Sequence, residues 1–238
     1  MSGLFTGGLG DPVPELRLAR TLALGLSRPD FDLAQVVGGW VDTRAEVPYP
    51  DEVSGSLTWL ADHGVPAPDR AFGPGLAASL VTLPLVLRTS ASKLNVVSGA
   101  FHVARLLDPH PVGQWAAVAV SVVAACFLHS RLDFAADLIE ALRSNDAPSS
   151  LLAVARWVPI GDRRPREGVT VGPVEAELAA LFGTLYHQPN RAKAWGALEG
   201  RGKRVERLGS ALLGARDGGS ADALPNDLEA LLDRLNSE

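Results

Sequence analysis

The run from Trp115 to Leu128 is the most apolar part of the chain, and it limits the fold more than any other feature. It contains no charged residue. It is shorter than the roughly 20 residues that a helix needs to cross a bilayer. A helix that is apolar on all sides belongs at the centre of a folded protein. The sequence therefore predicts a buried central helix with other helices packed around it, and no membrane partner.

The composition favours helices throughout. The chain is 47% hydrophobic, 21% charged and only 6% aromatic. Alanine and leucine dominate, and both are strong helix formers. No alternation of strands and helices is visible. We therefore expect an all-α fold in a single compact multi-helix domain over residues 1–238, a length that suffices for a substantial core.

The net charge and the cysteine content limit which partners the protein can bind and indicate the cellular compartment in which it works. The net charge is −5, which argues against a nucleic-acid partner held by phosphate contacts. The single cysteine, Cys126, fits a reducing compartment. The N-terminal residues lack the basic start and apolar run of a signal peptide. We expect a cytoplasmic protein.

Helix starts and apolar spacing place most of the elements. Pro14 suits the first turn of a helix, where its missing N–H does no harm, and Asp30 or Asp32 can cap the next helix. A third helix begins in the segment from Tyr49 to Glu52. Proline and glycine predict a mobile loop over 159–173. Further helices are expected over Leu76–Leu87, Asp133–Leu142, Leu151–Val158, Val174–Phe182, Lys203–Arg216 and Leu224–Leu235.

Several short segments occur in the order that one known family shows. They are Phe31–Trp40, Leu76–Leu87 with Pro84, Leu107-Asp-Pro-His-Pro111 and Ser210-Ala-Leu-Leu-Gly-Ala-Arg216. From about Gly10 onward the chain resembles the ADP-ribosylglycohydrolase family. The resemblance implies the multi-helix fold of that family, shortened at the N-terminus by its first helix.

The resemblance also implies that the magnesium site of the family is lost. The family carries Gly-Gly-Asp-x-Asp-Thr before the closing segment, and the two aspartates and the threonine fall on Arg201, Lys203 and Arg204. Magnesium requires oxygen ligands, whereas Arg and Lys have no lone pair to give. Of the family's N-terminal Asp-Asp-Thr triplet, only Asp11 remains. We expect no metal and no cofactor.

Three interpretations of this basic run stay open. The run consists of Arg201, Lys203, Arg204 and Arg207. In the first interpretation, it faces Asp11 across the former metal cleft, and Arg201 and Lys203 hold an anion such as a phosphate or pyrophosphate. In the second, the basic side chains form ion pairs with Asp11 and Glu15 and close the cleft. In the third, the run is a solvated helix face, where charges contribute little.

Asp11, Glu15 and His110 are weak catalytic candidates. Asp11 and Glu15 are four residues apart, so they share one face if a helix begins at Pro12. Two carboxylates can act as acid and base if their pKa values differ. An N-cap is the more ordinary role of Asp11. His110 lies in a turn between two prolines.

These observations are compatible with three functions, each of a different class. The first is a metal-free pseudoenzyme that acts as a scaffold or regulator of a protein partner. The second is a binding module for ADP-ribose or another anionic small molecule. The third is a metal-independent enzyme that acts on a small metabolite in the same cleft. Leu- and Ala-rich helix faces are also compatible with a homodimer.

Overall fold

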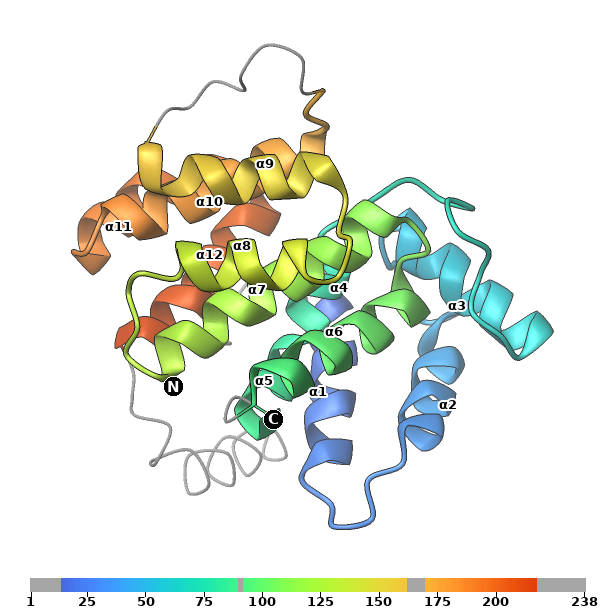
Figure 1. The fold of residues 1–238 in the computed structure, drawn as a ribbon. Helices are drawn as coiled ribbons and strands as arrows, with labels where there is room; N and C mark the ends of the chain where they lie inside the picture. The colour runs from blue at the N-terminus through green and yellow to red at the C-terminus, as the bar shows by residue number, and fades with distance from the viewer. Residues whose placement is uncertain (1–13, 90–91, 162–169, 218–238) are drawn as a thin grey trace.

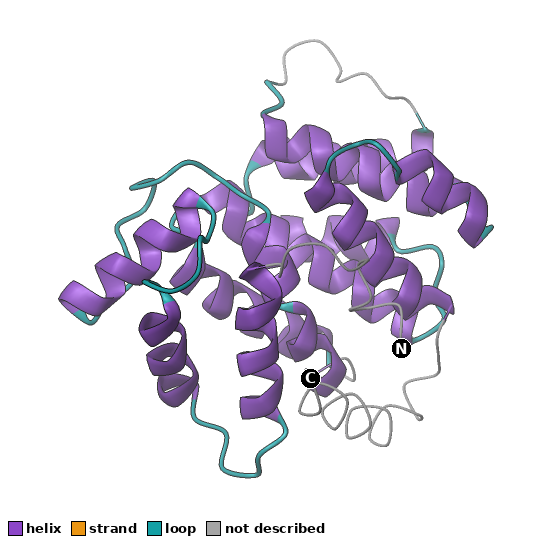
Figure 2. Cartoon of the chain, turned by 180° about the vertical axis from the view of Figure 1, so that it is seen from behind, coloured by secondary structure: helices purple, strands orange, loops and turns teal. Residues whose placement is uncertain are grey.

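The computed structural model describes residues 14–89, 92–161 and 170–217. Every regular element in these residues is a helix, and no β-strand occurs among them (Figures 1 and 2). The elements are α1 (Pro14–Leu26), α2 (Leu33–Thr43), α3 (Asp51–His63), α4 (Ala77–Val81), α5 (Leu83–Thr89), α6 (Lys93–Leu107), α7 (Pro111–Leu128), α8 (Ala135–Arg143), α9 (Ser149–Trp157), the 3₁₀ helix η1 (Val158–Ile160), α10 (Pro173–His187), α11 (Arg191–Leu198) and α12 (Lys203–Asp217). The prediction of an all-α fold is confirmed.

Helix α7 lies at the centre, as the apolar run predicted. It packs against α4, α5, α6, α8, α9, α10 and α12 (Figure 1). Its 18 residues have a mean hydropathy of 1.8, enough by length and composition to cross a membrane, yet 83% of them are buried inside the protein. Cys126 is among the buried residues. Burial by protein on all sides explains the apolar composition.

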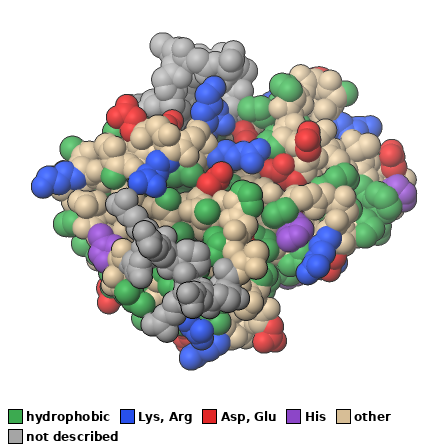
Figure 3. Space-filling model, turned by 90° about the horizontal axis from the view of Figure 1, so that it is seen from above, with side chains coloured by type: hydrophobic (Ala, Val, Ile, Leu, Met, Phe, Trp, Pro, Cys, Tyr) green, Lys and Arg blue, Asp and Glu red, His purple; other side chains and the backbone are tan. Residues whose placement is uncertain are grey.

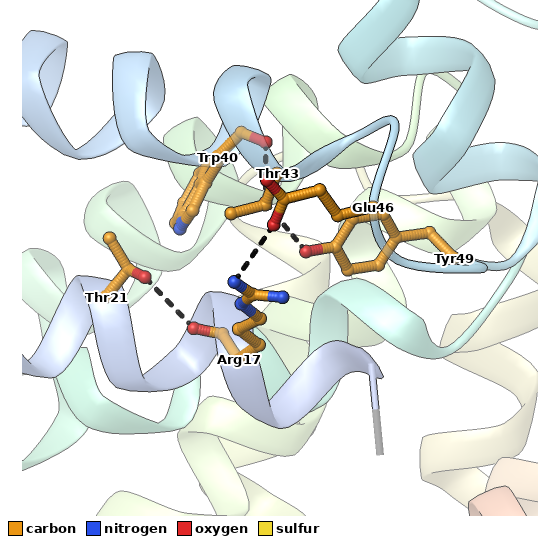
Figure 4. Close-up of polar contacts among 6 residues, drawn as sticks. All are labelled: Arg17, Thr21, Trp40, Thr43, Glu46 and Tyr49. Atoms are coloured by element: carbon orange, nitrogen blue, oxygen red, sulfur yellow. Dashed lines mark hydrogen bonds and ion pairs between the residues drawn. The ribbon is translucent and has the colours of Figure 1, made fainter. Parts of the chain in front are cut away.

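The N-terminal helices form a second apolar cluster, which α7 joins through Ala117. The buried Trp40 of α2 anchors it, and its indole N–H donates to the carbonyl of Leu18 over 3.0 Å. Figure 4 shows polar contacts near Trp40: Arg17 pairs with Glu46 at 3.2 Å, and Thr43 shares a 2.8 Å hydrogen bond with Tyr49. These contacts join α1 and the end of α2 to the loop that precedes α3.

Most helix starts follow the expected chemistry. Helix α1 begins at Pro14. Asp32 caps α2 by accepting a hydrogen bond from the Ala34 N–H over 2.9 Å. Helix α7 begins at Pro111, and the ring of His110 accepts from the Val112 N–H over 3.2 Å.

The segment 76–87 departs from the prediction, because it is two helices rather than one. Helix α4 ends at Val81, and α5 begins at Leu83. Pro84 has no N–H to donate to the carbonyl four residues earlier, so a continuous helix would lose a hydrogen bond there. The Thr82 N–H closes α4 on the Ala78 carbonyl, and the Leu85 N–H donates to the Thr82 carbonyl.

Two helices, α6 and α11, were not predicted. Helix α6 carries the required spacing, since Val96, Ala100, Val103 and Leu107 are buried along one face. The expected helix over 224–235 and positions 162–169 of the expected loop lie outside the described residues. The remainder of that loop contains η1, and α10 begins at Pro173.

Candidate functional site

Four buried carboxylates from different parts of the chain lie at or near helix starts and are connected through their neighbours. They are Glu15 of α1, Glu52 of α3, Asp108 just before α7 and Glu175 of α10, here called the carboxylate cluster. The charge of Glu52 acts on Asp108, and that of Glu175 acts on His110. Glu15 is connected to Glu52 through α12, whose Arg207 and Arg204 contact the two carboxylates. All four residues are buried, with exposed fractions of 3%, 8%, 0% and 5%. Figure 3 shows acidic and basic side chains next to one another near the middle of one face of the molecule. The partial positive charge of helix N-termini favours carboxylates at such positions.

Asp108 is the most constrained member of the cluster. Its Oδ2 accepts from the Gly75 N–H over 2.9 Å, and its Oδ1 accepts from the His110 N–H over 2.8 Å. A Cβ at Gly113 would overlap this carboxylate, so only glycine fits there. Burial raises the pKa of Asp108 to about 7, and the charge of Glu52 adds to the rise, while the two hydrogen bonds oppose it.

His110 lies beside Asp108 and serves as the N-cap of α7. Burial lowers its pKa, and the positive charge of Arg70 lowers it further, whereas the charge of Glu175 acts in the opposite direction. Arg70 holds a left-handed backbone conformation with φ of 63°, and its N–H donates to the Pro109 carbonyl over 3.0 Å. The turn before α7 is therefore tied to the loop that follows α3.

Two arginines of α12 lie against two of these carboxylates. Arg207 is 3.7 Å from Oε2 of Glu15, and Arg204 is 3.8 Å from Oε1 of Glu52. These two oxygens have no hydrogen-bond partner among the described residues. The guanidinium groups are therefore their nearest charge compensation. The structure thus contains one pair of the kind expected in the ion-pair interpretation, between the basic run and Glu15.

The structure does not bring all the predicted binding residues together. Arg204 contacts the carboxylate cluster, but Arg201 does not. The Nε–H of Arg201 donates to the Ala197 carbonyl over 2.8 Å. Lys203 is exposed at the start of α12. Asp11 lies outside the described residues, so its expected place opposite the basic run stays a prediction.

Arg201 instead borders a separate cavity of about 780 Å³ between α9, η1, α10 and α11. Most of the wall is apolar, and a few polar side chains are spread among the apolar ones. The lining residues are Val154, Trp157, Val158, Ile160, Gly161, Val171, Ala176, Ala179, Ala180, Gly183, Thr184, His187, Gln188, Ala197 and Arg201. The residues of the basic run therefore lie at two separate sites: Arg204 and Arg207 at the carboxylate cluster, and Arg201 at the cavity.

Sequence reasoning missed three members of the cluster: Glu52, Asp108 and Glu175. Asp108 gave a signal, because it lies in Leu107–Pro111, one of the segments that carry the family resemblance. Glu52 and Glu175 are acidic residues in first helical turns. That position is ordinary for Glu in any helix, so nothing in the pattern distinguished them.

The magnesium pair of the resembled family does not fit these residues. Among the described residues, no three His, Cys, Asp or Glu side chains lie close enough to hold a metal ion. The two arginines at the cluster carry positive charge and have no lone pair for a metal.

Comparisons with known proteins agree with the fold. No protein-family profile matches the chain, and no curated protein matches it. A solved structure described as an "ADP-ribosylglycohydrolase-related protein complex" superposes with a TM-score of 0.66 at 19% sequence identity. The superposition covers 94% of this chain and 80% of the other. At this identity the likeness concerns the fold alone, and it confirms that this chain has the helical fold of an ADP-ribosylglycohydrolase-related protein.

Proposed function

We propose that this protein is a degenerate relative of the ADP-ribosylglycohydrolases, a metal-free pseudoenzyme that acts in the cytoplasm as a scaffold or regulator. One observation carries the proposal. Arg204 and Arg207 lie within 4 Å of the buried carboxylates of Glu52 and Glu15. Positive side chains at these carboxylates are the opposite of what a magnesium-dependent hydrolase requires.

The electrostatic cost of placing magnesium beside these arginines is large. Two unit charges 4 Å apart interact by about 4 kcal/mol at an effective dielectric constant near 20, and a divalent ion doubles this figure. Glu15 and Glu52 would also have to exchange their guanidinium partners for the metal. A magnesium ion in this cluster would therefore face repulsion from Arg204 and Arg207 together.

A protein partner is part of the proposal. The solved structure with the same fold is described as a complex of an ADP-ribosylglycohydrolase-related protein. We extend that description to this chain as a proposal, in which it too acts in a complex. Ion pairs at the cluster would then preserve the shape of the scaffold after its chemistry is lost.

The test is calorimetric titration of the whole protein with ADP-ribose, with magnesium and again with excess chelator. An assay for release of ADP-ribose from a modified protein runs in parallel under both conditions. We expect no release and no magnesium-dependent binding heat. Release that requires magnesium would overturn the proposal, because the cluster would then bind the metal despite Arg204 and Arg207.

The second candidate function is a binding module for ADP-ribose or a related anion. It is favoured by the position of Arg201, whose guanidinium borders an open cavity rather than a carboxylate. Binding of ADP-ribose that ignores the chelator, with no release, would favour this module over the scaffold.

A metal-independent enzyme is the third candidate. A carboxyl group with a pKa of about 7, such as that of Asp108, matches what general acid catalysis at neutral pH requires. Asp108 is fully buried, however, and both of its oxygens accept main-chain hydrogen bonds. Release of ADP-ribose that survives the chelator would support this candidate against the other two.

A further inference from the structure

The cavity beside Arg201 has the build of a small-molecule site. One wall is a face of α10 formed by small residues three or four positions apart: Ala176, Ala179, Ala180, Gly183 and Thr184. Val154 and Trp157 of α9 form another wall. Its volume of about 780 Å³ and mostly apolar lining are typical of cavities that bind small organic ligands.

The polar groups of the cavity are few and of defined kinds. Thr184 of α10 offers a hydroxyl, Gln188 at the C-cap of that helix offers an amide, and Arg201 offers a guanidinium. The His187 ring stays in place because its Nε2 lies 2.7 Å from the Val158 carbonyl. Few polar groups on an apolar wall fix the orientation of a ligand rather than supply most of its affinity.

Arg201 differs from the arginines that follow it in the sequence. Arg204 and Arg207 each have a carboxylate within 4 Å, whereas Arg201 has no carboxylate partner among the described residues. Its Nε–H donates to a main-chain carbonyl, and within the described part of the chain its terminal nitrogens form no ion pair. A planar guanidinium donates two parallel hydrogen bonds to a phosphate or carboxylate. The charge of the cavity therefore matches an anionic ligand.

We propose that this cavity binds a small organic anion with a planar apolar ring. The ring lies on the small residues of α10 next to Trp157, because an aromatic face packs well against another ring. The phosphate or carboxylate of the ligand contacts the guanidinium of Arg201. The site is separate from the carboxylate cluster, and the inference deepens the second candidate function by stating the class of ligand that the cavity beside Arg201 takes.

The first experiment compares charged and uncharged probes on the ¹⁵N-labelled full chain by NMR titration. The probes are AMP and 2-naphthoate, with adenosine and 2-naphthol as the matched uncharged molecules. We expect at least one anion to bind ten-fold or more tightly than its uncharged counterpart, with shifts at Gly183, Thr184 and Arg201. AMP alone would identify a phosphate ligand, and 2-naphthoate alone a carboxylate ligand. Absence of binding by both anions, or shifts confined to other helices, would overturn the proposal.

Two pairs of variants test the location. A Cβ at Gly183 meets no atom within 4 Å, so Gly183→Leu introduces its side chain at an open position on the cavity wall. Gly38→Leu on α2 is the matched change, because a Cβ there also meets no atom within 4 Å. We expect Gly183→Leu to abolish binding and Gly38→Leu to preserve it. Arg201→Glu should weaken binding of the anions ten-fold or more, and Arg143→Glu at the exposed end of α8 should not. Unchanged affinity in Gly183→Leu would place the ligand elsewhere and refute the assignment.

Discussion

At the carboxylate cluster, Arg204 and Arg207 lie 3.8 and 3.7 Å from buried carboxylates, whereas Arg201 borders a cavity of about 780 Å³. The backbone explains the difference. Arg204 and Arg207 are three residues apart in α12 and share a face. Arg201 precedes that helix between Gly200 and Gly202, whose φ values of 79° and 114° favour glycine. A run of positive charge in the sequence is therefore two separate features in space.

The largest effect is expected at the carboxylate cluster, where Gly113→Ala tests the packing around Asp108. In most helices this change stabilises by about 1 kcal/mol. Here the new Cβ would overlap the carboxylate of Asp108, so we expect destabilisation of about 3 kcal/mol. Urea denaturation measures it. Gly196→Ala in α11, where a Cβ meets no atom within 4 Å, is the control and should stabilise slightly. Stabilisation in both variants would contradict the packing at Asp108.

The next largest effect concerns the arginine that neutralises Glu15. Arg207→Ala leaves the buried carboxylate of Glu15 without its nearest positive charge. Breaking a fully buried ion pair costs about 3–5 kcal/mol. Because Arg207 is partly exposed, we expect a smaller loss of unfolding free energy, about 2 kcal/mol. Adding Glu15→Gln should recover at least half of the loss.

The exposed pair Arg17–Glu46 provides the comparison for this prediction. Arg17→Ala should change the unfolding free energy by less than about 0.5 kcal/mol, as surface pairs usually do. Equal effects of Arg17→Ala and Arg207→Ala would show that burial of Glu15 contributes nothing.

The pKa of Asp108 predicts a smaller effect, which depends on pH. A carboxyl with a pKa of about 7 in the folded protein and 3.8 in the unfolded chain binds more protons when folded. Its contribution to stability is therefore complete below pH 3.8 and is lost as the pH rises through 7. His110 has a lowered pKa and contributes in the opposite direction below 6.5. Between pH 6.5 and 8, stability should fall by about 1 kcal/mol.

Asp108→Asn isolates this effect. The variant has no titrating group at the position, so the fall between pH 6.5 and 8 should disappear from its denaturation curves. A slope identical to that of the natural protein would mean that another group causes the pH dependence.

The smallest expected effect is that of Arg201→Glu. Its guanidinium pairs with no carboxylate among the described residues, so the unfolding free energy should change by less than about 0.5 kcal/mol. Thermal denaturation of Arg201→Glu beside Arg207→Ala gives the comparison. A loss as large as that of Arg207→Ala would place Arg201 in the structural core of the cluster.

Much of the fold followed from local patterns. The cap at Asp32 and the start at Pro14 are determined by residues within one helical turn. The central position of α7 followed from the continuous apolar run from Trp115 to Leu128. The break at Thr82 was missed because apolar residues continue across it, although Pro84 marks it. Helix α11 was missed because it exposes most of its surface and has little apolar spacing.

The site was less predictable, because its contacts join residues far apart in the chain. The resemblance pointed to the basic run and to Glu15, but not to Glu52 as the partner of Arg204. That pairing depends on how α3 and α12 approach one another. The separation of Arg201 from its neighbours depends on two glycines whose positive φ values the sequence alone did not reveal.

Helix α7 has a further consequence for the dynamics of the molecule. Its residues belong to both apolar clusters, Ala116 to one and Ala117 to the other. An opening that exposes its main-chain amides must separate both halves at once. The amide protons of α7 should therefore exchange with deuterium only through global unfolding. Amides of the more exposed α11 should exchange through local fluctuations, long before those of α7.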